Sequence, residues 1–308
     1  MAAVRKLGLA RVFDSDLWHS FTRSPVVVGS AAIALLMILA AVAAPLIAPQ
    51  NPFDLTQVSL MDASAPPAWS PGGDARFLLG TDDQGRDILS TILYGSRLSL
   101  LVGFASVIVS TVLGVALGLV SGYVGGRLDA VIMRVADVQL SFPSILIALL
   151  IDGVARVSLP RELHDQLVIY VLVLAIGLSG WVRFARTVRG STLVERGKEY
   201  VMAARVIGIP PLLIMLRHVL PNVLGPVLVI ATIDLAVAIL AEATLSFLGV
   251  GVPPTTPSLG TMIRIGQQYL YAGDWWITMF PGAALVLLVL SVNLFGDWLR
   301  DALNPKLR

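Results

Sequence analysis

The chain has 308 residues, of which 56% are hydrophobic and 14% are charged, and its mean hydropathy is +0.82. An ordinary soluble domain carries about 25% charged residues. This composition could not cover a water-facing surface, so an integral membrane protein is expected. The absence of cysteine excludes disulfides and thiol chemistry, and the formal net charge of +2 excludes a polycation that binds nucleic acid.

Six apolar segments follow one another along the chain, each able to cross a hydrocarbon core of about 30 Å as a helix of roughly 20 residues. They cover residues 25–47, 98–126, 130–151, 166–182, 222–245 and 275–296. Backbone groups in lipid must bond within their own segment, so the predicted fold is all-α, a bundle of six transmembrane helices. The first segment could be a cleaved signal peptide, but its apolar run exceeds the length of such a peptide, and a retained helix is favoured.

The positions of lysine and arginine predict the orientation of this bundle. With both termini inside, 16 of these residues fall on inner segments and 6 on outer segments. The asymmetry follows the positive-inside rule, so both termini are expected in the cytoplasm. The chain then divides into a cytoplasmic segment 1–24, a first helix with its outer loop 25–98, a transmembrane domain 99–298 that contains the inner loop 183–221, and a cytoplasmic tail 299–308.

The outer loop ends in a segment that has helix signals. Thr81 or Asp82 could provide an N-cap, because short polar side chains accept hydrogen bonds from the first amides of a helix. Residues 88–98 are predicted to form an amphipathic helix that lies on the outer membrane interface. Two interpretations stay open for this helix: contact with a protein that delivers the solute, or a structural collar around the first two spans.

The inner loop 183–221 combines basic charge with signals for ordered structure. Residues 198–207 are predicted to form a short helix that ends at Gly208, because the left-handed backbone at a helix end favours glycine. Two prolines follow directly, and neither continues a helix well. A second short helix is expected over residues 212–219, and Pro221 is expected to break the chain before the fifth span.

Two small residues, Ala203 and Ala204, lie side by side in the first of these short helices, where they would let another surface approach the backbone. A basic inner loop could also be held in place by anionic lipid alone. The helix, its glycine stop and the prolines together favour a docking element for a cytoplasmic partner.

Charged residues inside the predicted spans cost roughly 2.5–3.5 kcal/mol each at the bilayer centre. Asp234 and Glu242 lie in or near the fifth span, eight residues apart, so they could flank one polar stripe that lines a translocation path. Alternatively, either acid pairs with a basic residue of the bundle or lies at the end of the helix. Arg134 and Asp137 are three residues apart on one helix and are expected to pair with each other.

Motifs for enzyme chemistry are missing from the sequence. There is no Gly-x-x-x-x-Gly-Lys-Ser/Thr loop, so ATP would have to be bound by other chains. The three histidines, His19, His164 and His218, are far apart, and no metal motif or nucleophile motif accompanies them. The prediction is a chain that is not an enzyme and has no cofactor of its own.

The inner loop resembles the coupling motif of ABC importer permeases: Glu-Ala-Ala, three residues, Gly, nine residues, Ile, one residue, Leu-Pro. Five residues match at the required spacing, namely Ala203, Ala204, Gly208, Leu220 and Pro221. Met202 stands in place of Glu and His218 in place of Ile, two positions at which peptide-type permeases often vary. The resemblance implies that residues 199–209 dock in a cleft of an ATPase subunit. The residues assigned to this coupling site are Glu199, Tyr200, Met202, Ala203, Ala204, Arg205, Gly208, His218, Leu220 and Pro221.

Other segments resemble the C-type permeases of dipeptide and oligopeptide importers, and the resemblance extends from about residue 16 to the end of the chain. These segments are Leu79–Asp87, Tyr94–Leu100, Met133–Asp137, Ser141–Pro143, Ala241–Gly249, Asn293–Ala302 and Asn304–Lys306. Two departures, Thr91 in place of arginine and Ser258–Gly260 in place of Trp-Gly, concern only the outer face.

The resemblance implies a type I ABC importer permease bundle in the bacterial inner membrane. Its implied partners are a second, distinct permease in a heterodimer, two ATPase subunits that bind ATP and magnesium, a substrate-binding protein outside, and membrane lipid. The implied solutes are dipeptides or oligopeptides, with glutathione or nickel chelates as alternatives. A gradient-driven secondary transporter is the rival from another class, but it is expected to show paired broken helices and inverted repeats. A membrane enzyme is disfavoured by the missing motifs.

Overall fold

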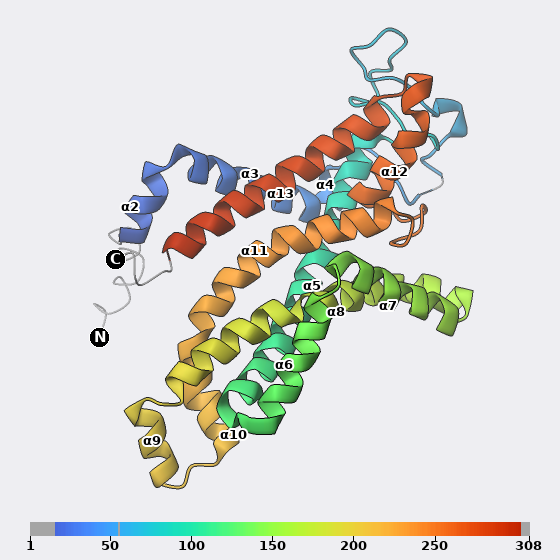
Figure 1. Ribbon diagram of the computed structural model, residues 1–308. Helices are drawn as coiled ribbons and strands as arrows, with labels where there is room; N and C mark the ends of the chain where they lie inside the picture. The colour runs from blue at the N-terminus through green and yellow to red at the C-terminus, as the bar shows by residue number, and fades with distance from the viewer. Residues whose placement is uncertain (1–15, 55, 303–308) are drawn as a thin grey trace.

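The computed structural model describes residues 16–54 and 56–302, and these residues fold into helices, turns and loops, with no strand among them. In Figure 1 the helices form an elongated bundle, with α9 and α10 at one end and α12 with the loop before α5 at the other. The helices are α2 (Asp16–Arg23), α3 (Pro25–Val42), α4 (Ala44–Ile47), η1 (Leu60–Asp62), α5 (Ile88–Val124), α6 (Gly126–Leu140), α7 (Ser144–Ser158), α8 (Arg161–Glu195), α9 (Glu199–Val206), α10 (Pro211–Ile214), η2 (Met215–Val219), α11 (Leu220–Phe247), α12 (Leu259–Tyr269), η3 (Leu270–Ala272) and α13 (Trp276–Ala302). The predicted segments 1–24 and 299–308 lie partly outside the described residues.

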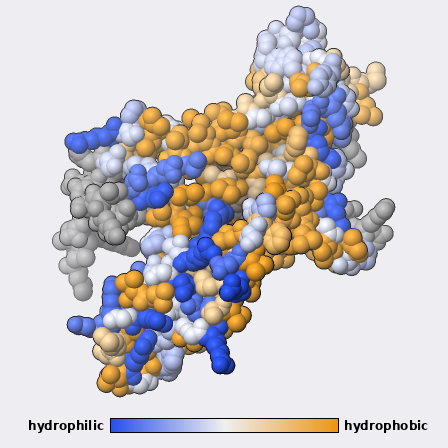
Figure 2. Space-filling view, viewed as in Figure 1, coloured by the Kyte–Doolittle hydropathy of each residue, from blue (hydrophilic) through white to orange (hydrophobic). Residues whose placement is uncertain are grey.

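Long apolar helices confirm the predicted all-α membrane bundle. Within the described residues, five helices are long and apolar enough to cross a membrane: α3, α5, α8, α11 together with the short helices before it, and α13. The pair α6 and α7 makes a sixth span if it is counted as one. Figure 2 shows hydrophobic side chains over much of the visible surface of these helices.

The third predicted span, residues 130–151, is wrong as a single helix. It consists of α6 and α7, which are bent by 95° at a short break. The break falls at Pro143, which supplies no backbone N–H and disfavours helical geometry in the residue before it. The part of the chain that the structure describes has one such bent pair, whereas the secondary-transporter alternative expects two broken helices in corresponding positions.

The outer helix predicted over residues 88–98 is also wrong as a separate interfacial element. These residues form the first turns of α5, which continues without a break for 37 residues. The N-cap is Asp87 and not Thr81 or Asp82, since its Oδ2 accepts hydrogen bonds from the Ser90 backbone amide (2.8 Å) and hydroxyl (2.6 Å). The second span is therefore about three turns longer than its uncharged stretch.

The segment that was predicted as the inner loop is largely helical. Helix α8 extends to Glu195, so the arginines at its inner end lie on a helix. The predicted break at Pro221 is absent, because the π-helical turn η2 joins α10 to α11 and the proline lies in the first turn of α11. A wider π turn accommodates a residue that has no backbone N–H.

Helices α5 and α8 share the most extensive contact among the described helices, and glycines make their close approach possible. Gly114, Gly118 and Gly122 lie at intervals of four, and therefore on one face of α5. A Cβ atom at Gly118 would lie 2.6 Å from the Ala185 carbonyl oxygen and 2.8 Å from Val188 Cβ. Small residues at such spacing are how membrane helices gain backbone contact without a hydrophobic driving force.

Candidate coupling site and polar contacts of the bundle

Helix α9 has the predicted position and the predicted stop. It runs from Glu199 to Val206, and Gly208 after it has a φ of +80°. The Gly208 amide donates to the Arg205 carbonyl and the Ile209 amide to the Ala204 carbonyl, both at 3.1 Å. This pair of bonds is a Schellman motif, which satisfies carbonyls at the end of the helix. The motif fixes where the chain turns after α9.

One face of α9 is packed and the other is open. Val201 and Ala204 are buried in the core cluster of the bundle, while Met202 points outward. Val206 and Ile207 are 87% and 74% exposed. Val206 and Ile207 therefore form an uncovered apolar patch at the end of α9.

Tyr200 ties α9 to two spans. Its hydroxyl donates to Glu195 at the end of α8 and accepts from Asn222 Nδ2 of α11 at 3.1 Å. Lys198 Nζ lies 2.5 Å from the same Glu195 carboxylate. Partial burial, and then the hydrogen bond to Glu195, raises the pKa of Tyr200 to about 12. The hydroxyl therefore stays protonated and donating at physiological pH.

Arg205 ties α9 to a third span. Its guanidinium lies over the ring of Tyr123 at 4.8 Å, and its Nε donates to the Tyr123 hydroxyl at 3.2 Å. Tyr123 belongs to the last turn of α5. Helix α9 is thus connected to α5, α8 and α11 through side chains, and a displacement of α9 would be transmitted to all three.

Replacing Tyr200 by phenylalanine is expected to loosen α9 without unfolding the bundle. The change removes a hydrogen bond to a carboxylate, which contributes about 1.5–3 kcal/mol, while Lys198 still pairs with Glu195. Hydrogen exchange of the amides in residues 199–209 should become about tenfold faster. Tyr170→Phe, at an exposed position of α8, is the control. Equal exchange in both variants would contradict the anchoring role.

The remaining residues of the predicted site follow α9 along the chain. His218 lies in η2 and its carbonyl accepts from Asn222 Nδ2 at 2.7 Å, while Leu220 and Pro221 begin α11. Ala203 is exposed beside the buried Ala204. Among the described residues, no group of three or more His, Asp and Glu could hold a metal ion.

Both acids of α11 have partners within the chain. Asp234 Oδ1 lies 2.5 Å from Arg183 Nη2 of α8. Glu242 is fully buried and accepts hydrogen bonds from the hydroxyls of Ser99 (2.5 Å) and Ser246 (2.7 Å). The burial of these acids is thus offset by an ion pair in one case and by two hydroxyl donors in the other.

The predicted pair of Arg134 with Asp137 is wrong. Asp137 pairs with Arg186 of α8, and Arg189 makes a two-pronged ion pair with Asp129 at 2.6 and 2.7 Å. Helix α8 therefore carries a row of three arginines, Arg183, Arg186 and Arg189, each paired with an acid on another helix. Their spacing of three residues is visible in the sequence and is the signal that was overlooked.

Comparison with known protein families identifies the family of this chain. The family model described as binding-protein-dependent transport system inner membrane component matches residues 114–308. The chain belongs to this family. A second model, the N-terminal TM domain of oligopeptide transport permease C, matches residues 15–67 of the permease.

Relatives extend the match over nearly the whole permease. It is 39% identical over 293 residues to the di/tripeptide transport system permease protein DppC of Pseudomonas aeruginosa, covering 95% of this chain and 92% of the relative. It is 41% identical over 293 residues to the dipeptide transport system permease protein DppC of Escherichia coli strain K12, covering 95% and 93%. The permease is a multi-pass inner-membrane subunit of an ABC importer, and ATP hydrolysis belongs to the ATPase subunits of such importers.

A solved structure supports the fold. A chain of the inward-facing MetNI methionine ABC transporter superposes with a TM-score of 0.54 at 22% sequence identity, covering 70% of this permease and 96% of that chain. The likeness confirms the bundle predicted for a type I ABC importer permease.

Proposed function

We propose that this permease is one of two distinct permeases in an importer for dipeptides or oligopeptides. Two ATPase subunits would lie below it, with ATP and magnesium bound there, and a substrate-binding protein would deliver the solute from outside. The relatives are named as transport permeases for dipeptides or for di- and tripeptides, and these names support the solute class. Another small solute, such as glutathione or a nickel chelate, is the second candidate.

The observation that carries the proposed coupling is the open apolar face of α9. Its inner face, with Val201 and Ala204, is packed on the bundle, and Val206 with the C-cap residue Ile207 is left uncovered on the outer side. In our proposal an ATPase cleft covers this outer face. ATP would close the ATPases, α9 would move, and the contacts of Tyr200 and Arg205 would carry the movement to three spans as a rigid-body change.

The orientation proposed for the permease places both termini in the cytoplasm. In Figure 1, α2 and the C-terminal end of α13 lie at the same end of the bundle as α9, which supports this proposal. Asp234 and Glu242 remain proposed positions along the translocation path. In this proposal their partners on α8 and α5 hold the acids while the bundle is in one state.

Reconstitution of the purified permeases with and without the ATPase subunits tests this function. Proteoliposomes that contain the complete complex and the loaded substrate-binding protein are expected to accumulate a radiolabelled dipeptide only when ATP is supplied, because no ATP-binding loop is present in this chain. Vesicles without the ATPases should accumulate none. Vigorous accumulation by the permeases alone would overturn the coupling proposal, and ATP-driven uptake of another solute in place of the peptide would overturn the solute class.

A further inference from the structure

A cavity with a mixed polar and apolar lining lies at the bend between α6 and α7. Its volume is about 230 Å³, and Arg183, Val182 and Ser179 of α8 line it together with Val237 of α11. Residues on both sides of the bend complete the lining, namely Gln139, Leu140, Phe142, Ser144 and Ile147. The cavity thus lies where the broken span leaves the bundle.

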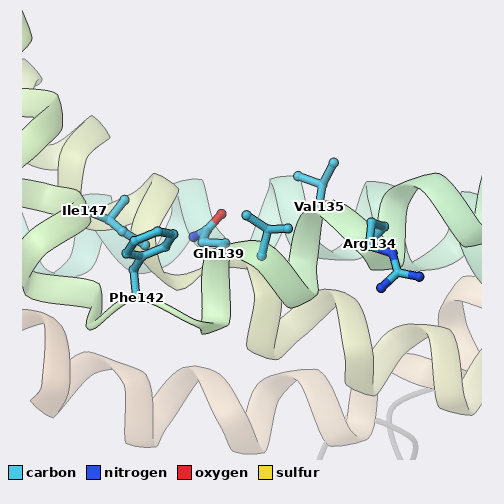
Figure 3. Close-up of a pocket in the computed structure, with 6 residues that line it drawn as sticks. Arg134, Val135, Gln139, Phe142 and Ile147 are labelled. Carbon is cyan, nitrogen blue, oxygen red and sulfur yellow. The ribbon is translucent and has the colours of Figure 1, made fainter.

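A second, apolar hollow of about 370 Å³ adjoins this cavity. It runs along α6 and shares Gln139, Phe142 and Ile147 with the cavity, and Arg134 lies at its far end (Figure 3). Val135 and Val138 make up its apolar wall. The two hollows share a wall, so they adjoin as one groove in which the polar groups, Arg183 among them, lie at the bend and apolar side chains follow α6.

Arg183 is the charged group of the cavity. Its side chain is 45% exposed, whereas its partner Asp234 is 4% exposed. An arginine within a membrane span costs several kcal/mol unless it serves a function or is paired. The ion pair engages Nη2, and a guanidinium has five N–H donors. Asp234 therefore fixes the side chain on the wall of the cavity and leaves the other guanidinium donors unengaged by this ion pair.

The other arginines of α8 do not share this situation. Arg186 pairs with Asp137 and Arg189 with both oxygens of Asp129, and neither arginine lines the cavity. Gln139 is also committed, since its amide donates to the Leu178 carbonyl at 2.8 Å and its oxygen accepts from the indole of Trp181. Arg183 is therefore the cation of this wall that is placed to meet a ligand.

We propose that this cavity binds the C-terminal carboxylate of a peptide in transit, with Arg183 as its partner and the apolar groove along α6 receiving the side chains. The proposal rests on the proposed peptide function. A carboxylate matches a guanidinium in planar, two-pronged geometry. An apolar groove beside it tolerates varied side chains, as a transporter of many peptides requires.

A single cysteine in the cavity tests the charge of the site. The chain has no cysteine, so Ser144→Cys is a unique reporter on this subunit. In the complete complex in inside-out vesicles, the cysteine should react faster with an anionic than with a cationic methanethiosulfonate. Arg183→Gln should lower this anion-to-cation rate ratio about tenfold, and Arg183→Lys should largely preserve it.

Arg186→Gln is the matched control, because it removes an arginine of similar exposure one turn along the same helix. Its rate ratio should stay within about twofold of the parent. An equal fall in both variants, an unchanged ratio in Arg183→Gln, or no reaction from either membrane face would overturn the proposal. If Arg183→Gln prevents assembly, the double variant Arg183→Gln/Asp234→Asn removes both charges, and the same ratio is measured there.

Protection by a peptide tests the ligand itself. Glycyl-leucine at millimolar concentration on the inner face should slow labelling of Ser144→Cys, while glycyl-leucine amide, which lacks the carboxylate, should not. Equal protection by both compounds, or protection by neither, would overturn the carboxylate assignment. Failure of this carboxylate site can be told apart from failure of the proposed function. If the proposed function is wrong, the reconstituted wild-type complex imports no dipeptide, even if the cysteine in the cavity still reacts faster with the anionic reagent.

Discussion

Replacing Gly208 by valine is expected to lower ATP-driven uptake at least tenfold while the subunit remains in the membrane. The backbone at Gly208 has a φ of +80°, and a Cβ atom there would meet nothing within 4 Å. The cost is therefore backbone strain, about 1–2 kcal/mol for an ordinary residue and more for a β-branched one. Relief of that strain unwinds the end of α9, so Val206 and Ile207 no longer lie together on its exposed side. Uptake and stimulated ATP hydrolysis in proteoliposomes measure the effect.

Two variants serve as controls for this result. Gly208→Asn should retain most of the uptake, because asparagine tolerates the left-handed region better than other residues with a Cβ atom. Gly190→Ala on α8 also introduces a Cβ into open space, but at a position without a positive φ, and should behave as wild type. Wild-type uptake by Gly208→Val would show that the geometry at the end of α9 is irrelevant to coupling.

Enlarging Gly118 is expected to destabilise the bundle more than any change at the surface. A Cβ atom there would lie 2.6 Å from the Ala185 carbonyl oxygen, so α5 and α8 would have to separate. Gly118→Ala should cost about 1–3 kcal/mol, and Gly118→Leu should prevent assembly. The melting temperature and the yield of monodisperse complex in detergent measure the effect.

Gly153→Ala is the matched control for helix packing. Gly153 lies in α7 and a Cβ atom there would meet nothing within 4 Å. Alanine is a better helix former than glycine by about 1 kcal/mol, so this variant should be at least as stable as wild type. If Gly118→Ala melts at the same temperature as Gly153→Ala, the close approach of α5 and α8 does not stabilise the fold.

Sequence reasoning located the features that depend on local chemistry. Apolar length placed the spans, and the glycine after a short helix placed the end of α9, because both properties act within one segment. Sequence reasoning failed where contacts between distant segments of the chain determine the structure. Asp137 has Arg134 three residues away on its own helix, yet it pairs with Arg186 of α8, since tertiary packing brings that guanidinium closer.

Helix interruptions were misjudged for a related reason. Pro143 breaks the third span, whereas Pro221 does not break the fifth. Both are prolines in apolar surroundings, and the difference lies in the backbone. Pro221 lies just after the π-helical turn η2, and this wider turn accommodates a residue without a backbone N–H inside a continuous helix. The angle of 95° between α6 and α7 depends on the packing of α7 against other helices, so the connecting residues Ser141–Pro143 alone do not predict it.

The unbroken length of α5 has a mechanical consequence. At 1.5 Å per residue, its 37 residues make a rod of about 55 Å, longer than the hydrocarbon layer it crosses. At one end, the Tyr123 hydroxyl accepts a hydrogen bond from Arg205 of α9. At the other end, the Ser90 hydroxyl accepts one from the Gln50 backbone amide in the loop before α5. A tilt of about 5° at one tip would swing the opposite tip by roughly 5 Å. One rigid helix thus links the α9 end of the bundle to the loop that precedes α5.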